Sequence, residues 1–230
     1  MAEPAATPPR IAIIIDDLGY DRHIARQFLE LDAPLTFAIL PFSPQNKRIA
    51  AAAHGRGREI MLHLPMEPLE YPHINPGAGV LLTSMSPDQL IGQLKKNLAD
   101  VPHIAGVNNH MGSRLTADSS RLYQIFSILK KEHLFFIDSQ TTGSSLCRSA
   151  ARLLQVPFAR RDVFLDNSLS ETYIRRQVNI LLRTAEHRGC AIGIGHPHEE
   201  TCRVLQEMLP RINQRARLVP ASQLVHLVDS

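Results

Sequence analysis

Tryptophan, paired cysteines and long apolar runs are all missing from this sequence. Tryptophan is absent from the 230 residues, and cysteine occurs only three times. Cys147, Cys190 and Cys202 form no C-x-x-C pair and are too few for a disulfide framework. No apolar run approaches the roughly 18 residues that a transmembrane helix requires, so we expect no membrane span. The N-terminus also lacks the basic, apolar and small-residue sections of a signal peptide.

Blocks of like charge are missing as well. The 25 Lys and Arg residues are interspersed with 22 Asp and Glu residues, which leaves a formal net charge of +3. A basic arm that would bind nucleic acid is therefore excluded, and no nucleic-acid partner is expected. The hydrophobic content of 44% is typical of a globular protein with a sizeable core.

Composition predicts one domain behind a short leader. Residues 1–9 are rich in Pro and Ala and are interpreted as a flexible lead-in, and no linker divides residues 10–230. Such a lead-in often follows a removed export signal. A cytosolic tail would have a similar composition. Taken together with the family resemblance given below, the lead-in predicts a periplasmic or secreted protein, with the signal segment absent from this sequence.

Short β-branched runs alternate with helical patterns, which indicates β/α units on a parallel sheet. Strands are expected at 11–15, 35–40, 59–63, 104–108, 134–137, 163–165, 191–195 and 217–219. Helices are expected around 24–31, 90–98, 118–131, 145–155, 170–188 and 200–213. In this α/β class, seven or eight units fit a TIM-like (β/α)7–8 barrel, complete or incomplete, better than an open doubly wound sheet.

Local signals mark several helix ends and one long loop. Ser43-Pro44 and Ser86-Pro87 each place a capping hydroxyl before a proline, and Ser168–Glu171 has capping-box spacing. Residues 65–85 contain four prolines and two glycines and have no helical or strand period. A loop of this length in a compact domain is usually functional.

Polar residues follow six of the expected strands. They are Asp16-Asp17, His63, Asn108-Asn109-His110, Asp138, Asp166-Asn167 and His196-Pro197-His198. Singly, each has a simpler explanation, because adjacent acids often cap helices and a histidine after an apolar run is often a core residue. In parallel β/α folds, however, the carboxyl ends of the strands open on one face. The repetition therefore predicts one shared site.

The chemistry of this set favours a catalytic metal. One carboxylate and two imidazoles suit Zn²⁺ or a related divalent ion and leave a coordination position open for water. A dication beside Asp17 would offset the cost of holding Asp16 ionised next to it. One acid could then bind the metal while the other acts as a base.

The motifs resemble those of the divergent polysaccharide deacetylase family, which is related to the NodB-type carbohydrate esterases. "IIIDDLG" resembles the T-F-D-D-G motif, "GREIMLHLPME" lies where H-x-x-x-H is expected, and "GIGHPHEET" takes the place of L-x-H. "GVNNHMGS", "FFIDSQTT" and "RDVFLDN" are similar to blocks of the divergent branch. The resemblance covers nearly the whole chain. It implies a barrel of the deacetylase type, with Asp16 as general base, Asp17 and His63 as metal ligands, and His196 as general acid.

Two departures from the superfamily pattern concern the rest of the site. Glu67 stands where the second histidine of H-x-x-x-H is expected, and "NNHMGS" stands where the R-x-P-x-G arginine motif is expected. We take His110 as the third metal ligand, with Glu67 as its alternative. We predict that four polar side chains shape the sugar site together with the 65–85 loop: Glu67, Asn109, Asp138 and Asp166.

The resulting hypothesis is a metal-dependent hydrolase, most simply a zinc carbohydrate (polysaccharide) deacetylase that removes N- or O-acyl groups from a glycan. The alternative is a glycan-binding or cell-envelope module on the same fold with weak or no turnover, which the missing arginine motif favours. A metal phosphoesterase is a third reading. It is disfavoured because D-x-D spacing and a Gly-rich phosphate loop are both absent.

Overall fold

The computed structural model describes residues 8–229 and shows a parallel sheet surrounded by helices. The strands are β1 (Arg10–Leu18), β2 (Thr36–Ile39), β3 (Glu59–Met66), β4 (Ile104–Met111), β5 (Phe135–Asp138), β6 (Phe158–Arg160), β7 (Val163–Phe164), β8 (Cys190–Gly195) and β9 (Arg217–Leu218). The helices are α1 (Arg22–Glu30), α2 (Asn46–His54), α3 (Pro87–Asp100), α4 (Ser119–Lys131), α5 (Cys147–Leu154), α6 (Glu171–Arg188) and α7 (Glu199–Arg215). Two short 3-10 helices, η1 (Leu115–Ala117) and η2 (Ala221–Gln223), complete the assignment.

The strand order is that of an incomplete barrel. Neighbours run β6-β5-β4-β3-β2-β1-β8-β7, and β9 pairs with the start of β1. β6 and β7 are the two edges and do not pair with each other, although only Arg161 and Asp162 separate them in the chain. The predicted TIM-like α/β fold is confirmed, in its incomplete form.

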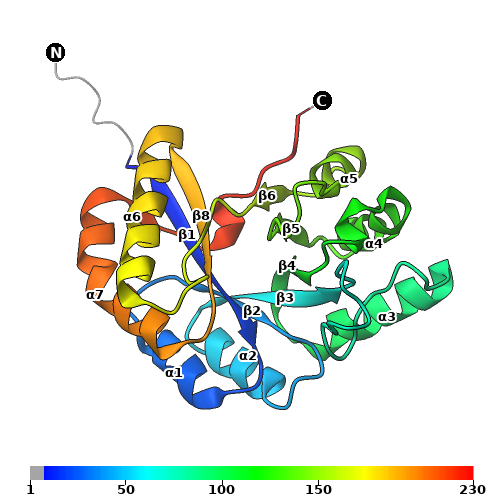
Figure 1. Cartoon of the computed structure of the whole chain (residues 1–230), viewed down its shortest axis with the longest axis horizontal. Helices are drawn as coiled ribbons and strands as arrows, with labels where there is room; N and C mark the ends of the chain where they lie inside the picture. The colour runs from blue at the N-terminus through cyan, green and yellow to red at the C-terminus, as the bar shows by residue number, and fades with distance from the viewer. Residues whose placement is uncertain (1–7, 230) are drawn as a thin grey trace.

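The helices cover the outside of the curved sheet. α1, α2, α6 and α7 lie along one part of the outer surface, and α3, α4 and α5 along the other (Figure 1). The large core between sheet and helices includes the fully buried Phe28, Phe126 and Leu181. Among residues 8–229, no helix has both the length and the apolar character needed to cross a bilayer.

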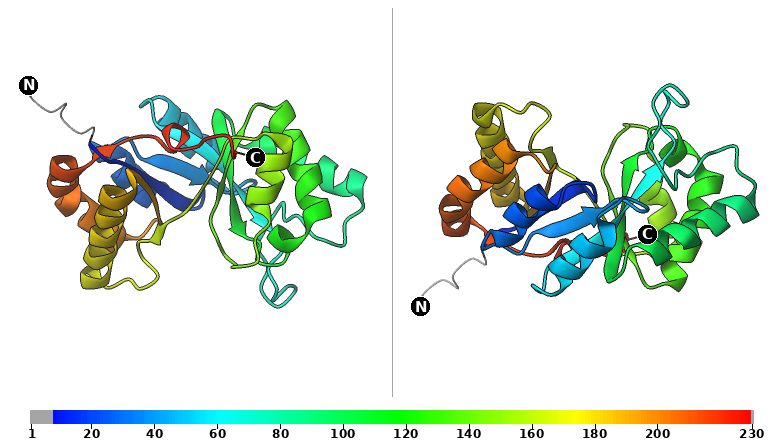
Figure 2. Two further views of the ribbon diagram at one scale, coloured as in Figure 1. Left: turned by 90° about the horizontal axis from the view of Figure 1, so that it is seen from above. Right: turned by 90° about the horizontal axis from the view of Figure 1, so that it is seen from below.

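A second, smaller core fills the inside of the sheet. Its strand residues include Ala12, Ile14, Met61, Ile137, Ala159, Ile192 and Ile194. Side chains along a strand alternate between the two faces, so these residues point inward while their neighbours face the helices. Val219, Ala221 and Leu224 from the C-terminal segment join the same cluster. This segment, red in Figure 2, crosses from β9 toward β6, where His226 pairs with Phe158.

The local predictions had mixed outcomes. The Ser86-Pro87 start is confirmed, since Ser86 and Gln89 form a complete capping box at α3. The Ser43-Pro44 start was wrong, because Ser43 Oγ donates to the Leu40 carbonyl and α2 begins only at Asn46. At α6 the capping box is also absent, since the N-cap Ser170 makes no side-chain capping bond. β6, three residues long, was not predicted.

Candidate metal centre

The site residues are among the last residues of the strands or follow them directly, and several strands extend further than predicted. β1 includes Asp16 and Asp17, β3 includes His63, and β4 includes His110. In three strands an inward apolar residue is followed two positions later by a polar one; the pairs are Ile14 and Asp16, Met61 and His63, and Ile194 and His196. Strand alternation therefore places Asp16, His63 and His196 as a polar layer above the apolar interior.

Asp17 breaks this alternation, and its backbone explains how. Its φ of 55° lies in the left-handed region, and the β1–β2 register shifts between Ile15 and Leu18. Such a bulge rotates the chain, so Asp17 faces the same group as Asp16 although the two are adjacent. Gly19 follows with a φ of 141°, and a Cβ there would lie 1.9 Å from Ser43 Oγ. The chain can leave β1 in this way only at a glycine.

Asp17, His63 and His110 form a compact group of possible metal ligands. Asp17 Oδ1 lies 3.1 Å from His63 Nε2 and 2.9 Å from His110 Nδ1, and the two nitrogens are 3.1 Å apart. Ligands about 2.0–2.1 Å from a tetrahedral ion lie roughly 3.3 Å apart, so these spacings suit a small divalent metal. Asp17 Oδ1 is buried and has no hydrogen-bond partner among the described residues. The residues present therefore fit a metal ion.

Charge at the group is set by burial and by its neighbours. Burial raises the pKa of Asp16, although the nearby His63 and His196 oppose this. Burial also opposes ionisation of Asp17, but the imidazoles of His110 and His63 outweigh it, so the pKa of Asp17 lies well below its ordinary value. The side chain of Asp17 is 36% exposed and that of His63 only 3%, so the group opens to solvent on the Asp17 side.

Asn108 connects the metal group to Asp16. Its Nδ2 donates to Asp16 Oδ1 at 2.7 Å, so its Oδ1 faces His63 Nδ1 at 2.9 Å. An amide oxygen only accepts, which requires the proton of His63 to sit on Nδ1 and leaves Nε2 free for a metal. Sequence reasoning chose Asn109 instead. Strand alternation would have selected Asn108, two residues before His110 on the same face.

His196 is held by Asp166 beside this group. Asp166 Oδ1 lies 2.8 Å from His196 Nδ1, while Oδ2 accepts from the His196 backbone N–H at 2.6 Å and from Thr201 Oγ1 at 2.7 Å. Burial lowers the pKa of His196, but Asp166 outweighs it and raises the pKa to about 9. Asp166 therefore orients His196, and its contact with substrate stays a prediction.

The other three predicted substrate residues have partners within the protein. Asn109 Oδ1 accepts from the Ser139 N–H, and Asp138 accepts from Ser145 Oγ at 2.7 Å. Both residues point toward the helices by strand alternation. Glu67 Oε2 accepts from the N–H and the hydroxyl of Thr83. Contact with substrate stays a prediction for these residues, whereas their hydrogen bonds hold the strand ends and the segment after β3. Glu67 does not belong to the metal group.

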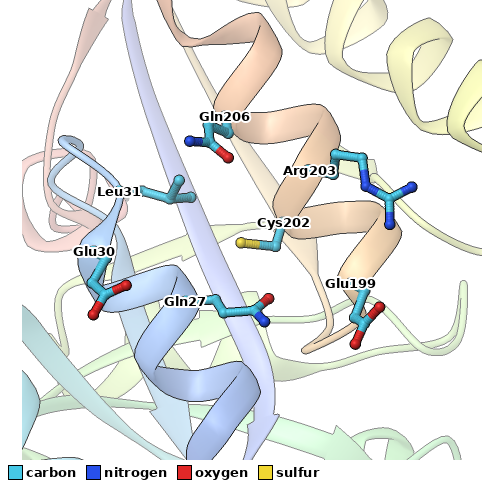
Figure 3. Close-up of a pocket in the computed structure, with 7 residues that line it drawn as sticks. All are labelled: Gln27, Glu30, Leu31, Glu199, Cys202, Arg203 and Gln206. Carbon is cyan, nitrogen blue, oxygen red and sulfur yellow. The ribbon is translucent and has the colours of Figure 1, made fainter.

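A surface pocket between α1 and α7 lies outside this site. It has a volume of about 350 Å³ (Figure 3) and is lined by Gln27, Glu30, Leu31, Glu199, Cys202, Arg203 and Gln206. None of the predicted site residues lines it. Burial raises the pKa of the Cys202 thiol to about 11, so the cysteine is not an activated nucleophile.

The curled parallel sheet is a β/α barrel of the type found in solved polysaccharide deacetylases. The Asp-His-His group lies at the carboxyl ends of its strands. The model of the divergent polysaccharide deacetylase family matches residues 13–225, and the chain belongs to this family. It is 37% identical over 217 residues to the uncharacterized protein YibQ of Escherichia coli K12, covering 94% of this chain and 67% of that protein.

Solved structures share the fold. An uncharacterized protein from Agrobacterium tumefaciens C58, ATU2773, matches with a TM-score of 0.91 and 27% identity over 97% of this chain and 92% of its own. A family 4 acetyl xylan esterase from Clostridium thermocellum, in complex with a cobalt ion, matches with a TM-score of 0.59 at 14% identity, covering 94% and 89%. The peptidoglycan deacetylase PdaC from Bacillus subtilis has a TM-score of 0.55 at 16% identity, covering 95% and 90%.

Proposed function

We propose that this protein is a metal-dependent hydrolase that removes acyl groups from a carbohydrate. The observation that carries the proposal is the convergence of Asp17, His63 and His110 next to the buried Asp16. Family membership supports it, as does the metal-bound esterase among the proteins of the same fold. Zn²⁺ is the proposed metal, because one carboxylate and two imidazoles are among its preferred ligands.

Each residue has a separate role in the proposed reaction. Asp17, His63 and His110 would hold the ion, which when bound would activate water and stabilise negative charge on the acyl oxygen. Asp16 takes the proton of the attacking water, and burial raises its pKa toward the range of an effective general base. His196, protonated at neutral pH through Asp166, donates a proton to the departing amine or hydroxyl group.

Metal content tests the ligand assignment. We expect purified protein reconstituted with Zn²⁺ to hold one ion, measured by elemental analysis after gel filtration, and Asp17→Ala or His63→Ala to lose it. His187→Ala, an exposed histidine on α6, is the matched control and should keep the ion. Unchanged stoichiometry in Asp17→Ala would remove the assignment.

Turnover separates the hydrolase from a binding module. Acetate release from a panel of N- and O-acetylated oligosaccharides should be detectable for the zinc-loaded protein and lost in Asp16→Asn. Binding to these glycans without acetate release would favour the alternative, a glycan-binding module, which the replacement of the arginine motif by "NNHMGS" supports. Activity retained by Asp16→Asn would eliminate it as the base.

A periplasmic or secreted location is part of the proposal. The lead-in that motivated it falls largely on residues 1–7, which lie outside the described residues. Fractionation of cells that express the protein from its natural gene, with detection by antibody, tests the location. Recovery with the cytoplasmic fraction would contradict it.

A further inference from the structure

Arg161 lies beside the metal group and is not absorbed by the proposed reaction. It follows Ala159 by two positions, and Ala159 belongs to the inner cluster, so strand alternation directs Arg161 to the inside. Its guanidinium carbon lies 3.6 Å from the centre of the Phe164 ring, and that ring is 5.9 Å from the ring of His196. The charge of Arg161 also acts on that of Asp16. These contacts place the guanidinium at the proposed site.

The guanidinium is held in a fixed position by neutral groups. Nε donates to the Ser139 carbonyl at 2.8 Å and Nη2 to the Gln140 carbonyl at 3.1 Å, while Phe164 covers one face. A planar fork that is fixed in this way loses little entropy when it binds a further group. Nη1 makes no hydrogen bond within residues 8–229, so it is free for a ligand.

No acid neutralises this half-buried charge by direct contact in the part of the chain that the structure describes. Three aspartates act on it from a distance, and each has its own partners. Asp16 accepts from Asn108, Asp138 from Ser145, and Asp162 from Arg188. A partly desolvated guanidinium without an ion pair is unfavourable, and a carboxylate is the group that its fork matches best.

We propose that Arg161 binds a carboxylate of the ligand, so that the glycan recognised at this site is an acidic one. The proposal rests on the proposed function for the position of the sugar, but it concerns binding rather than turnover. The carboxylate could belong to a uronic acid ring or to a lactyl ether on an amino sugar. Both sources present the same planar anion to the guanidinium.

Matched pairs of oligosaccharides test the proposal. The first pair is a hyaluronan tetrasaccharide and its carboxyl-reduced, neutral form; the second is the disaccharide N-acetylglucosaminyl-N-acetylmuramic acid and neutral chitobiose. Affinity is measured by calorimetry with the zinc-loaded full chain. We expect the acidic member of at least one pair to bind roughly 10- to 100-fold more tightly, as for a charge-assisted hydrogen bond. The pair that shows the preference identifies the source of the carboxylate.

Variants distinguish recognition from a structural role of the same side chain. Arg161→Gln should abolish the preference for the acidic ligand, and Arg161→Lys should keep part of it. Arg160→Gln, the exposed neighbour, is the control and should leave the preference unchanged. If Arg161→Gln weakens the binding of both members of a pair equally, Arg161 has only a structural role, which is to hold the segment around Ser139 and Gln140, and the proposal is wrong.

The test of acidic-glycan binding can fail or succeed independently of the test of hydrolysis. Preferential binding without acetate release would support acidic recognition while removing the hydrolase. Equal affinity for, or failure to bind, both members of both pairs would overturn the role of Arg161, even if acetate is released from neutral glycans.

Discussion

At the scale of single residues, Asn108 sets the state of two neighbours at once. Its amide nitrogen binds Asp16 and its amide oxygen faces His63 Nδ1, and all three side chains are buried. The direction of the amide therefore fixes the tautomer of His63. It also favours the ionised form of Asp16, because a carboxylate oxygen is a stronger acceptor for the amide N–H than an oxygen of the neutral carboxyl group.

Replacement of Asn108 should weaken metal binding without removing a ligand. In Asn108→Ala we expect zinc affinity and turnover to fall about 10- to 100-fold, as for partners that orient metal ligands elsewhere. Asn109→Ala on the opposite face of β4 is the comparison. It should cost about 1–3 kcal/mol of stability through the Ser139 N–H and leave zinc affinity unchanged. Competition with a chelator measures the affinity. Equal affinities in Asn108→Ala and wild type would contradict the role.

The ion pair of His196 with Asp166 predicts a pH dependence. Asp166 raises the pKa of His196 to about 9 from the ordinary 6.5. In the proposed reaction His196 donates a proton, which it can do only when protonated, so activity should fall as pH rises through about 9. In Asp166→Asn this fall should move toward 6.5. NMR titration of the His196 ring measures the pKa directly and does not depend on turnover. Asp162→Asn removes a partner of Arg188 and not of His196, so it should leave the pH of the fall and the pKa of His196 unchanged.

The ion pair of His196 with Asp166 also makes the free energy of unfolding depend on pH. The raised pKa of His196 contributes stability that is complete below pH 6.5 and is lost as pH rises toward about 9. The lowered pKa of Asp166 contributes stability above its ordinary value of 3.8 that is lost at more acidic pH. Urea unfolding should therefore show the largest difference between wild type and Asp166→Asn between these limits. A difference that grows above pH 9 would contradict the assignment.

At the scale of elements, strong local patterns predicted the fold, and side-chain direction limited prediction of the site. Amphipathic helices such as 119–131 and β-branched runs such as 11–15 carry their own signal. β6 was not predicted because three residues show no period, and its partners, β5 and the segment around His226, are distant in sequence.

The Asp-His-His group could be predicted because polar residues recur at strand ends. Strand alternation also points to Asn108, but its hydrogen bonds to Asp16 and His63 could not be predicted, nor could the position of Arg161, because both depend on contacts between strands. The bulge at Asp17 is likewise not encoded in a local pattern. Register between distant strands determines all three.

Glu67 anchors the segment between β3 and α3. Its carboxylate accepts two hydrogen bonds from Thr83 and lies 3.3 Å from Arg114 Nε. Glu67→Gln should therefore cost about 1–3 kcal/mol and make residues 68–86 cleave faster in limited proteolysis, with zinc content unchanged. Glu70→Gln, exposed on the same segment, should do neither. Loss of zinc in Glu67→Gln would instead restore Glu67 as a ligand.

At the scale of the whole molecule, the C-terminal segment closes one end of the incomplete barrel. Val219 N–H donates to the Ile11 carbonyl, and the Ala221 N–H donates to Thr36 Oγ1. Leu224 is buried in the inner cluster, whereas Leu227 is 49% exposed. The apolar floor under the polar layer is therefore completed by residues that follow β9.

Two leucines of this segment provide a matched test. Leu224→Ala should lower the free energy of unfolding by about 2–5 kcal/mol, because it opens a cavity under the site. Leu227→Ala should change it by no more than about 0.5 kcal/mol. Urea denaturation measures both. Equal unfolding midpoints would show that the segment does not stabilise the barrel.

The position of this segment in the chain also constrains biosynthesis. Its partners lie in β1, β2, β3 and β6, which leave the ribosome long before residues 219–226 do. Until then the inner cluster lacks Val219, Ala221 and Leu224. During synthesis, the sheet therefore exposes part of its apolar inner face until the C-terminal segment has left the ribosome. At this stage we expect chaperones to bind the nascent chain, and we expect chains that terminate early to aggregate.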